Sequence, residues 1–286
     1  MFSKPVKILK GNIFTKSVSQ HYSKQCSQKT ITFDLDETLG DFGDLYILWK
    51  EIEHLIPIPH RETVFRELLD LFPEFLRPGI LPILEFLLHK KQIGICSHVF
   101  LYTNNQCPKE WTHRIIQYFS ERTPNLFDQI ICAFKINNQR IEPLRTTHSK
   151  TYSDLIRCTL LPKHSEVCFV DNTFHPKMVN ERVYYIQPKS YKHGLSHTEM
   201  IHRFVTKWTS TPVPDNIEKN LQDTFARYMS TMEISKKGGC SQLESIHVSQ
   251  KIMYHLKEYF LLYTKMPKTK KILLGLGRFT RKKRVS

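Results

Sequence analysis

Apolar residues follow two spacings along this chain. Short runs rich in β-branched and aromatic side chains predict buried strands, at residues 30–33, 93–102, 129–134 and 167–170. Longer stretches with a period of about 3.6 predict amphipathic helices, at residues 45–56, 61–71, 80–91, 109–120 and 152–160. The polar pair Asn137-Asn138 suits the turn of a hairpin. Strands that alternate with helices predict an α/β fold, with a parallel sheet flanked by helices.

Polar side chains follow three of these strands at the point where each strand ends. They are Asp34 and Asp36 after the first strand, Thr103 and Asn104 after the second, and Asp171 and Asn172 after the last. Residues two apart in a strand share a face, so Asp34 and Asp36 are expected to point the same way. Ligand sites in parallel sheets lie beyond the carboxyl ends of the strands, so the three groups are expected to meet there.

Two carboxylates held this close repel each other unless a cation or a shared proton lies between them. Mg²⁺ takes one or two carboxylates and keeps several waters, and Asp34 and Asp171 are its expected ligands. With the charge of a phosphate screened, Asp34 can attack phosphorus and form an aspartyl-phosphate. Asp36 can protonate the leaving oxygen and later accept a proton from the attacking water.

Two further side chains are expected to hold the phosphoryl oxygens. Thr103 offers a hydroxyl at the end of a strand, and Lys150 offers a positive charge at the start of a predicted helix. Lys135 and Lys163 are alternatives to Lys150, although Lys163 lies too near the strand at 167–170 to reach back easily. Each candidate also has a purely structural interpretation, because a threonine often caps a helix and a lysine is usually solvated.

The segment FDLDETL at residues 33–39 resembles the first motif of the haloacid dehalogenase (HAD) superfamily of phosphatases, in which the first aspartate is the nucleophile and the second the acid/base. Tyr102-Thr103-Asn104 is similar to the second motif of that superfamily, Lys150 to its third and Val170-Asp171-Asn172 to its fourth. The resemblance implies these site residues: Asp34 and Asp36 as catalytic groups, Thr103, Asn104 and Lys150 as phosphate-binding groups, and Asp34, Asp36, Asp171 and Asn172 as the Mg²⁺ site.

A narrower resemblance is to the FCP/SCP branch, also called NLI-interacting-factor-like domains. The segment DLDETL is followed by LRPG at 76–79, by EFL at 85–87 and by VDN at 170–172. The resemblance, which covers residues 28–206, implies a Mg²⁺-dependent protein Ser/Thr phosphatase that acts on the C-terminal repeat domain of RNA polymerase II. The chain departs from the branch where DNTFHP at 171–176 replaces the usual D-N-S-P, and where TNN at 103–105 replaces T-A-S.

The chain is expected to have four parts. These are a basic N-terminal arm at 1–28, a HAD-like domain at 29–210, a helical extension at 211–265 with helices at 215–234 and 242–263, and a basic tail at 266–286. Between the motifs the chain has room only for elements that the HAD core itself can use, so no large cap is expected over the site. An open site suits a phosphate carried by a macromolecule.

The formal net charge of +15 favours acidic partners, such as a nucleic acid, an anionic membrane surface or a phosphorylated protein. The seven cysteines include no C-x-x-C pair and predict a reducing, intracellular compartment, either the nucleus or the cytoplasm, or a host cell if the chain is viral. No apolar run approaches the roughly 18 to 20 residues of a membrane span, so no membrane span is expected.

Three functions are consistent with these observations. The leading interpretation is a Mg²⁺-dependent phosphatase that acts on phosphoserine or phosphothreonine of a protein. The second is a nucleic-acid 3′-end phosphatase, because the basic arm and tail would bind a polyanion. The third is a catalytically silent scaffold with the same fold, which the presence of every residue that the chemistry requires disfavours. The sequence predicts no particular oligomeric state.

Overall fold

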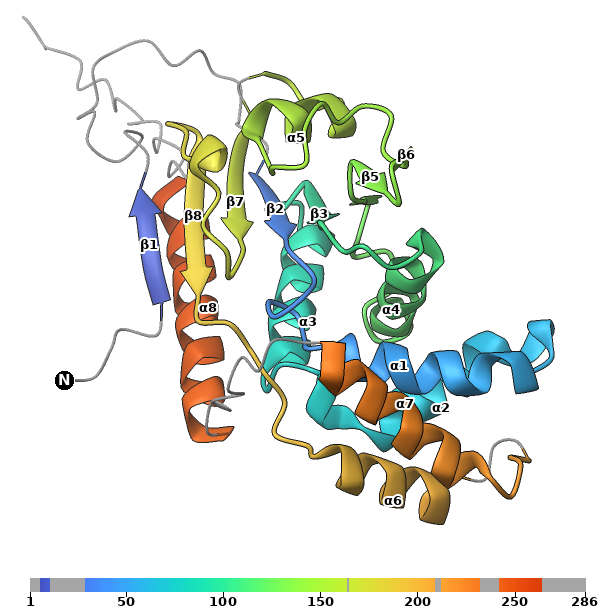
Figure 1. Cartoon of the computed structure of the whole chain (residues 1–286). Helices are drawn as coiled ribbons and strands as arrows, with labels where there is room; N and C mark the ends of the chain where they lie inside the picture. Colours follow the sequence, from blue (N-terminus) through green and yellow to red (C-terminus); the bar gives the residue numbers. More distant parts are fainter. Residues whose placement is uncertain (1–5, 11–28, 164, 209–211, 232–241, 264–286) are drawn as a thin grey trace, which may run out of the picture.

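The computed structural model describes residues 6–10, 29–163, 165–208, 212–231 and 242–263. Their central feature is a six-stranded sheet with the strand order β1-β8-β7-β2-β3-β4 (Figure 1). The strands are β1 (Val6–Lys10), β2 (Lys29–Phe33), β3 (His98–Tyr102), β4 (Gln129–Ile131), β7 (Glu166–Val170) and β8 (Val183–Pro188). The strands from β8 to β4 are parallel to one another, and β1 runs antiparallel along β8. The predicted α/β fold with a parallel sheet is confirmed.

The helices fall largely where the apolar period predicts them. They are α1 (Gly43–Ile52), α2 (Arg61–Leu71), α3 (Ile80–Gln92), α4 (Lys109–Arg122), α5 (Tyr152–Thr159), α6 (His197–Lys207), α7 (Ile217–Thr231) and α8 (Gln242–Tyr263). Short 3₁₀ turns are η2 (Glu53–Leu55), η3 (Ile58–His60), η4 (Pro73–Phe75) and η5 (Pro176–Met178). The predicted hairpin is present as β5 (Lys135–Ile136) and β6 (Gln139–Arg140), and both residues of its Asn137-Asn138 turn have positive φ, as a type I′ turn requires.

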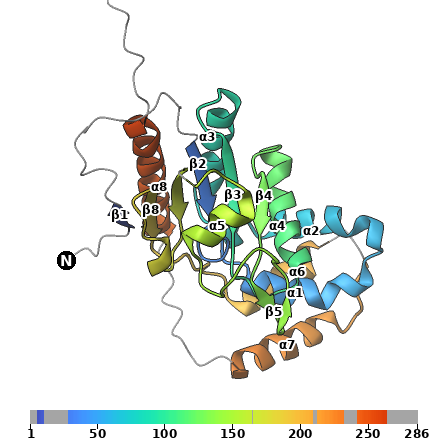
Figure 2. The ribbon, with the colours of Figure 1, turned by 90° about the horizontal axis from the view of Figure 1, so that it is seen from above.

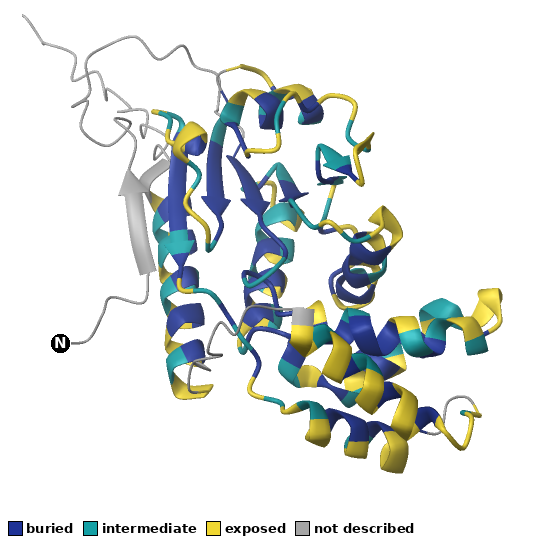
Figure 3. Ribbon diagram, in the orientation of Figure 1, coloured by how far each residue is buried: buried dark blue, intermediate teal, exposed yellow. Residues whose placement is uncertain are grey.

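Helices cover both faces of the sheet (Figure 2). On one face α8 contacts β8, β1 and α3, and on the other face α5 contacts β4. Figure 3 shows β2, β7 and β8 as largely buried, and every residue of β2 is buried. Burial on both faces explains why β3 and β7 read as nearly continuous apolar runs rather than as an alternation.

Several elements differ from the predicted ones. The strand predicted at 93–102 begins only at His98, because Gly94 takes a left-handed φ of +71° and residues 93–96 donate their N–H groups to the last turn of α3. The helix predicted at 45–56 ends at Ile52, and the strand predicted at 129–134 ends at Ile131. Strands β1 and β8 and helix α6 were not predicted, although Val183–Pro188 is an apolar run of the expected kind.

Four of the described helices gather beyond the carboxyl ends of the strands and form a helical layer (α1, α2, α6 and α7; Figure 1). Within it, α7 contacts both α6 and α1. The rings of Trp49 and Phe65 join α1 to α2 with their centroids 5.2 Å apart, and the rings of His197 and Phe225 join α6 to α7 at 4.3 Å. This layer was not expected, because α1 and α2 were assigned to the sheet core and α7 to a separate extension.

The two helices of the predicted extension belong to different parts of the fold. While α7 joins the helical layer, α8 packs on the sheet through residues that are almost fully buried: Val248, Ile252, Leu256, Tyr259 and Phe260. The Tyr259 hydroxyl donates to the Glu166 carbonyl oxygen at 3.1 Å, and Lys29 Nζ donates to the Phe260 carbonyl oxygen at 2.6 Å. These contacts tie α8 to the first residues of β7 and β2, so α8 is part of the core.

A Leu256→Ala substitution tests whether α8 is part of the core. Leu256 is completely buried, so its truncation is expected to lower the free energy of unfolding by about 2–5 kcal/mol, through lost apolar burial and the cavity that remains. Urea unfolding measures this change. Leu243→Ala on the same helix removes a side chain that is 80% exposed and serves as the matched control. Equal stability of the two variants would mean that α8 does not pack on the sheet.

Parts of the predicted organisation lie outside the described residues. They include the basic tail at 266–286 and residues 1–5 and 11–28 of the basic arm. None of the described helices is both long enough and apolar enough to cross a membrane.

Candidate active site

Asp34 and Asp171 lie side by side at the carboxyl end of the sheet. They follow the neighbouring parallel strands β2 and β7, and the Asp34 N–H donates to the Val170 carbonyl oxygen at 2.9 Å. Lys150 lies between the two carboxylates. Its Nζ donates to Asp34 Oδ1 and, at 2.7 Å, to Asp171 Oδ2. All three side chains are almost completely buried, so water screens these charges only weakly.

The backbone around Lys150 explains why this lysine reaches the site. Lys150 directly precedes Thr151, whose side chain caps α5, and the Thr151 N–H donates to the Tyr102 hydroxyl at 3.2 Å. Tyr102 is the last residue of β3, so this bond ties the start of α5 to the carboxyl edge of the sheet. The two alternatives lie elsewhere, since Lys163 is exposed and the Lys135 ammonium lies over the ring of the preceding phenylalanine.

The buried carboxylates carry more negative charge than Lys150 can offset. Burial raises the pKa of Asp34 to about 7, against the opposing charge of Lys150. Burial also raises the pKa of Asp36, while a hydrogen bond from Asn105 opposes this rise. Burial acts to raise the pKa of Asp171 too, but the charge of Lys150 prevails and holds it below its ordinary value. A second cation at this site would therefore favour the ionised form of Asp34.

Thr38 and Asn172 support Asp34 from the side opposite Lys150. Thr38 Oγ1 lies 3.2 Å from Asp34 Oδ2 and 3.0 Å from Asn172 Oδ1, and it accepts a hydrogen bond from the Asn172 N–H at 3.1 Å. The Asn172 amide nitrogen donates to Glu37 Oε2 at 3.1 Å and to Ser190 Oγ at 3.0 Å. Both ends of the Asn172 amide thus have protein partners, which suits a positioning role better than the predicted role of a direct metal ligand.

Asp36 is the more accessible of the two carboxylates after β2. It is partly exposed, and its Oδ2 accepts a hydrogen bond from Asn105 Nδ2 at 2.9 Å. The Asn105 N–H donates to Thr103 Oγ1 at 3.0 Å, and its side-chain oxygen accepts from the Cys107 N–H at 2.8 Å. Asn105 was not predicted as a site residue, although it belongs to the TNN segment that departs from the family pattern.

Arg145 is completely buried and holds Thr103 and Asn104 in place. It was not predicted as a site residue. Arg145 donates to the Thr103 carbonyl oxygen at 3.0 Å, to Asn104 Oδ1 at 2.7 Å and to the Cys132 carbonyl oxygen at 2.7 Å. The side-chain oxygen of Asn104 is therefore engaged with Arg145. The predicted phosphate-binding role falls more naturally to Thr103 and to the backbone of this segment.

Asp171 has a further neighbour in His175. Asp171 Oδ2 lies 3.2 Å from His175 Nε2, and Asp171 Oδ1 accepts from the Thr173 N–H at 2.8 Å. His175 was not predicted as a site residue. Its signal in the sequence is the departure from D-N-S-P, because this departure places a histidine four residues after the aspartate.

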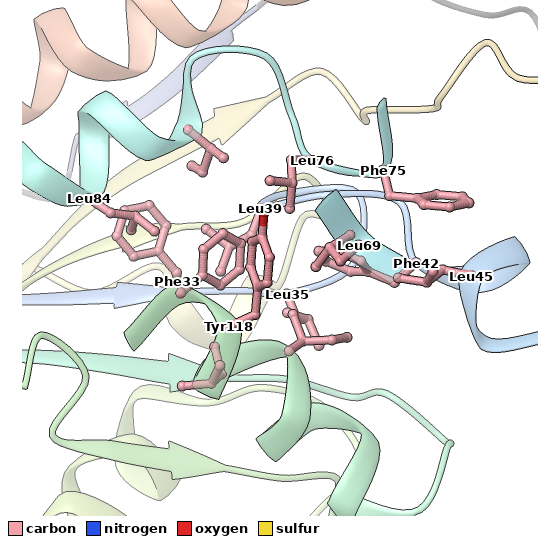
Figure 4. Close-up of a cluster of buried hydrophobic side chains, with 14 of the residues drawn as sticks. Phe33, Leu35, Leu39, Phe42, Leu45, Leu69, Phe75, Leu76, Leu84 and Tyr118 are labelled. Carbon is pink, nitrogen blue, oxygen red and sulfur yellow. The ribbon is translucent and has the colours of Figure 1, made fainter. Parts of the chain in front are cut away.

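The loop after Asp36 is rigidly supported by the buried Arg77. Its Nε donates to the Thr38 carbonyl oxygen at 2.6 Å, and its Nη2 donates to the Glu37 carbonyl oxygen. Glu37 has a left-handed φ of 59°, a conformation that such bracing stabilises. Figure 4 shows the apolar cluster around this loop, in which Leu35 and Leu39 lie among side chains from α1, α2 and α3. These contacts give Arg77 a structural role in steadying the loop.

A Gly40→Ala substitution tests how tightly this loop is packed. A Cβ at Gly40 would overlap the Phe75 carbonyl oxygen and the Phe42 ring, so a loss of about 1–3 kcal/mol in the free energy of unfolding is expected. Thermal unfolding measures the loss. Gly194→Ala is the matched control, since a Cβ there has no neighbour within 4 Å. A Gly40→Ala protein as stable as the control would show that the loop relaxes freely.

The donors at this site are oxygen atoms, which suit a hard cation such as Mg²⁺. Among the described residues, no group of three or more His, Cys, Asp or Glu side chains is arranged to hold a metal ion. Within the predicted set of Asp34, Asp36, Asp171 and Asn172, Lys150 lies between the carboxylates of Asp34 and Asp171. Asp34 and Asp171 are the carboxylates that would hold an ion that keeps most of its waters, as Mg²⁺ does.

Predicted site residues from four separate segments thus meet at the carboxyl edge of the sheet. Lys150 contacts both Asp34 and Asp171, Thr38 contacts both Asp34 and Asn172, and Thr103 is linked to Asp36 through Asn105. Comparisons of the chain with protein-family models, with curated proteins and with solved structures each found no match.

Proposed function

We propose that this chain is a Mg²⁺-dependent phosphatase that works through an aspartyl-phosphate intermediate. The observation that carries the proposal is the contact of Lys150 with both Asp34 and Asp171 in a buried site at the carboxyl edge of the sheet. A buried lysine between two carboxylates offsets part of their negative charge, and the same lysine can attract a phosphoryl group that enters the site. The resemblance of residues 33–39 and 170–172 to HAD motifs supports the same chemistry.

The proposed reaction has two steps. In the first, a carboxylate oxygen of Asp34 forms a bond to phosphorus while the bond to the leaving oxygen breaks, and Asp36 gives its proton to that oxygen. In the second, Asp36 takes a proton from a water, the water oxygen bonds to phosphorus, and the bond from phosphorus to Asp34 breaks. Bound Mg²⁺ would supply positive charge at the phosphoryl oxygens and at Asp34.

The protein provides groups suited to each of these roles. Thr38 holds one oxygen of Asp34 and so orients the nucleophile. Burial raises the pKa of Asp36, which favours the protonated form that the first step needs. Lys150 and the Thr103 hydroxyl supply charge and a hydrogen bond for the phosphoryl oxygens.

Phosphoserine or phosphothreonine of a protein is the proposed substrate. The helical layer lies beyond the same edge of the sheet, but it leaves three site residues partly exposed: Asp36, Asn172 and His175. This partial exposure supports access by a macromolecule without a closing cap. The C-terminal repeat domain of RNA polymerase II is the substrate that the FCP/SCP resemblance implies. The second candidate is a nucleic-acid 3′-end phosphatase, which the net charge of +15 favours.

Phosphate release from three substrates in parallel tests the proposal. They are a generic aryl phosphate, a phosphoserine heptad-repeat peptide and a 3′-phosphorylated oligonucleotide, each with Mg²⁺ and with EDTA. Turnover that requires Mg²⁺ is expected, with the peptide preferred. Preference for the oligonucleotide, with a steep salt dependence, would favour the second candidate. No turnover of any substrate would leave the scaffold interpretation in its place.

A further inference from the structure

The segment that follows Asp171 is a short loop held in one shape by Tyr185, a buried residue of β8. The Tyr185 hydroxyl accepts a hydrogen bond from the His175 N–H at 3.0 Å and donates one to the Thr173 carbonyl oxygen at 2.5 Å. The Thr173 N–H in turn donates to Asp171 Oδ1 at 2.8 Å. Residues on both sides of Phe174 are therefore fixed by hydrogen bonds.

This fixed loop turns two adjacent side chains in different directions. The His175 ring lies against Asp171, with Nε2 3.2 Å from Oδ2, and its side chain is 13% exposed. The Phe174 ring instead lies nearly parallel to the Tyr185 ring, with centroids 6.2 Å apart, and 46% of the residue remains exposed. The loop thus presents a large apolar ring to solvent, three residues from a buried carboxylate of the site.

We infer that Phe174 is a specificity-determining residue, whose ring receives an apolar side chain next to the phosphorylated residue of a peptide substrate. This inference rests on the proposed phosphatase function. Asp171 shares Lys150 with Asp34, and Phe174 lies three residues after Asp171, on the rim of the site formed by residues 173–175. A peptide whose phosphorylated side chain reaches Asp34 would therefore pass its neighbouring residues along this rim. An apolar side chain that covers the exposed ring gains affinity without distorting the loop, which is already held by its own hydrogen bonds.

A peptide suits this rim better than a nucleic acid does. Proteins that bind single-stranded nucleic acid combine base stacking on aromatic rings with cationic side chains that neutralise the adjoining backbone phosphates. Two lysines in this part of the structure are each engaged with two carboxylates: Lys150 with Asp34 and Asp171, and Lys192 with Glu37 and Asp41. A second backbone phosphate would have to compete with these carboxylates, whereas an uncharged apolar side chain would not.

Paired phosphoserine peptides test the inference. The peptides carry either Leu or Gly at the positions on both sides of phosphoserine, and kcat/KM is measured for wild type, Phe174→Ala and Phe174→Tyr. Wild type is expected to prefer the Leu peptide by about tenfold, since contact with the ring removes apolar surface from water. In Phe174→Ala this ratio is expected to fall to about one, and in Phe174→Tyr it is expected to persist. Tyr254→Ala is the control, because Tyr254 is an aromatic residue on α8 that is 63% exposed.

A binding measurement separates this inference from the proposed function. Fluorescence anisotropy with non-hydrolysable phosphonate analogues of both peptides reports the contact whether or not turnover occurs. Tighter binding of the Leu analogue by wild type, lost in Phe174→Ala, supports the contact even if no substrate is hydrolysed. An unchanged Leu-to-Gly ratio in Phe174→Ala would overturn the inference. A Phe174→Ala defect confined to the 3′-phosphorylated oligonucleotide would also overturn it, in favour of base stacking.

Discussion

An Asp34→Asn protein is expected to lose Mg²⁺-dependent phosphate release by at least about 10⁴-fold while remaining folded. The amide has nearly the shape of the carboxylate and can keep the contact with Thr38, but it cannot attack phosphorus. Phosphate release and far-UV circular dichroism, measured on the same preparations, check both halves of this result. Asp215→Asn alters an exposed carboxylate away from the site and is the matched control. Activity retained in Asp34→Asn would rule out the aspartyl-phosphate mechanism.

The same substitution has an expected effect on stability in the metal-free protein. Burial raises the pKa of Asp34 from 3.8 to about 7, so the folded state holds this proton more tightly than the unfolded state does. The contribution of Asp34 to stability is therefore largest below pH 3.8 and is lost as the pH rises to about 7. The amide of the variant cannot titrate. In EDTA, the free energy of unfolding of wild type minus that of Asp34→Asn should fall across this range, and a flat difference would contradict the raised pKa.

A Lys150→Met substitution is expected to remove both activity and much of the stability. It leaves the carboxylates of Asp34 and Asp171 buried without their shared cation, which is expected to cost about 3–5 kcal/mol in the metal-free protein at neutral pH. The loss of a positive charge beside the phosphoryl group should also lower kcat by at least about 100-fold. Urea unfolding and phosphate release measure the two effects.

Two controls make the Lys150 result specific. Lys163→Met removes an exposed lysine and should change neither quantity. Lys150→Arg should not restore activity, since a planar guanidinium does not fit where a compact ammonium lies between two carboxylates. Mg²⁺ should stabilise Lys150→Met more than wild type, because the ion then becomes the main counter-charge for the two aspartates. If Lys150→Met is as stable and active as wild type, Lys150 has no role at this site.

Much of the fold follows from local patterns, because burial of a helix face or of both faces of a strand leaves a periodic trace in the sequence. The period identified α2, α3, α4 and α5 and the strands β2 and β7 closely. It failed for the start of β3, where the isoleucines at 93 and 95 continue an apolar run although Gly94 turns the chain. It also could not show that α7 and α8 pack on different parts of the fold. The apolar face of an amphipathic helix indicates that one side is covered, but not which partner covers it.

The candidate site divides in the same way. Asp34, Asp36, Thr103 and Asp171 could be identified because a polar residue directly after an apolar strand stands out in the sequence. Three supporting residues could not be identified in this manner: Asn105, Arg145 and His175. They lie in loops without periodicity, and their contacts with Asp36, Thr103 and Asp171 depend on how separate segments meet in space.

The sequence by itself determined the alternation of strands and helices and the residue types at the carboxyl ends of the strands, because both are properties of neighbouring residues. Only the tertiary structure decided which lysine reaches the aspartates. The bond from the Thr151 N–H to the Tyr102 hydroxyl holds Lys150 at the edge of the sheet, whereas Lys163 lies beyond α5 and is exposed. The tertiary structure also decided that Phe174 points outward while His175 faces Asp171, because the Tyr185 hydroxyl on the neighbouring strand β8 sets the shape of their loop.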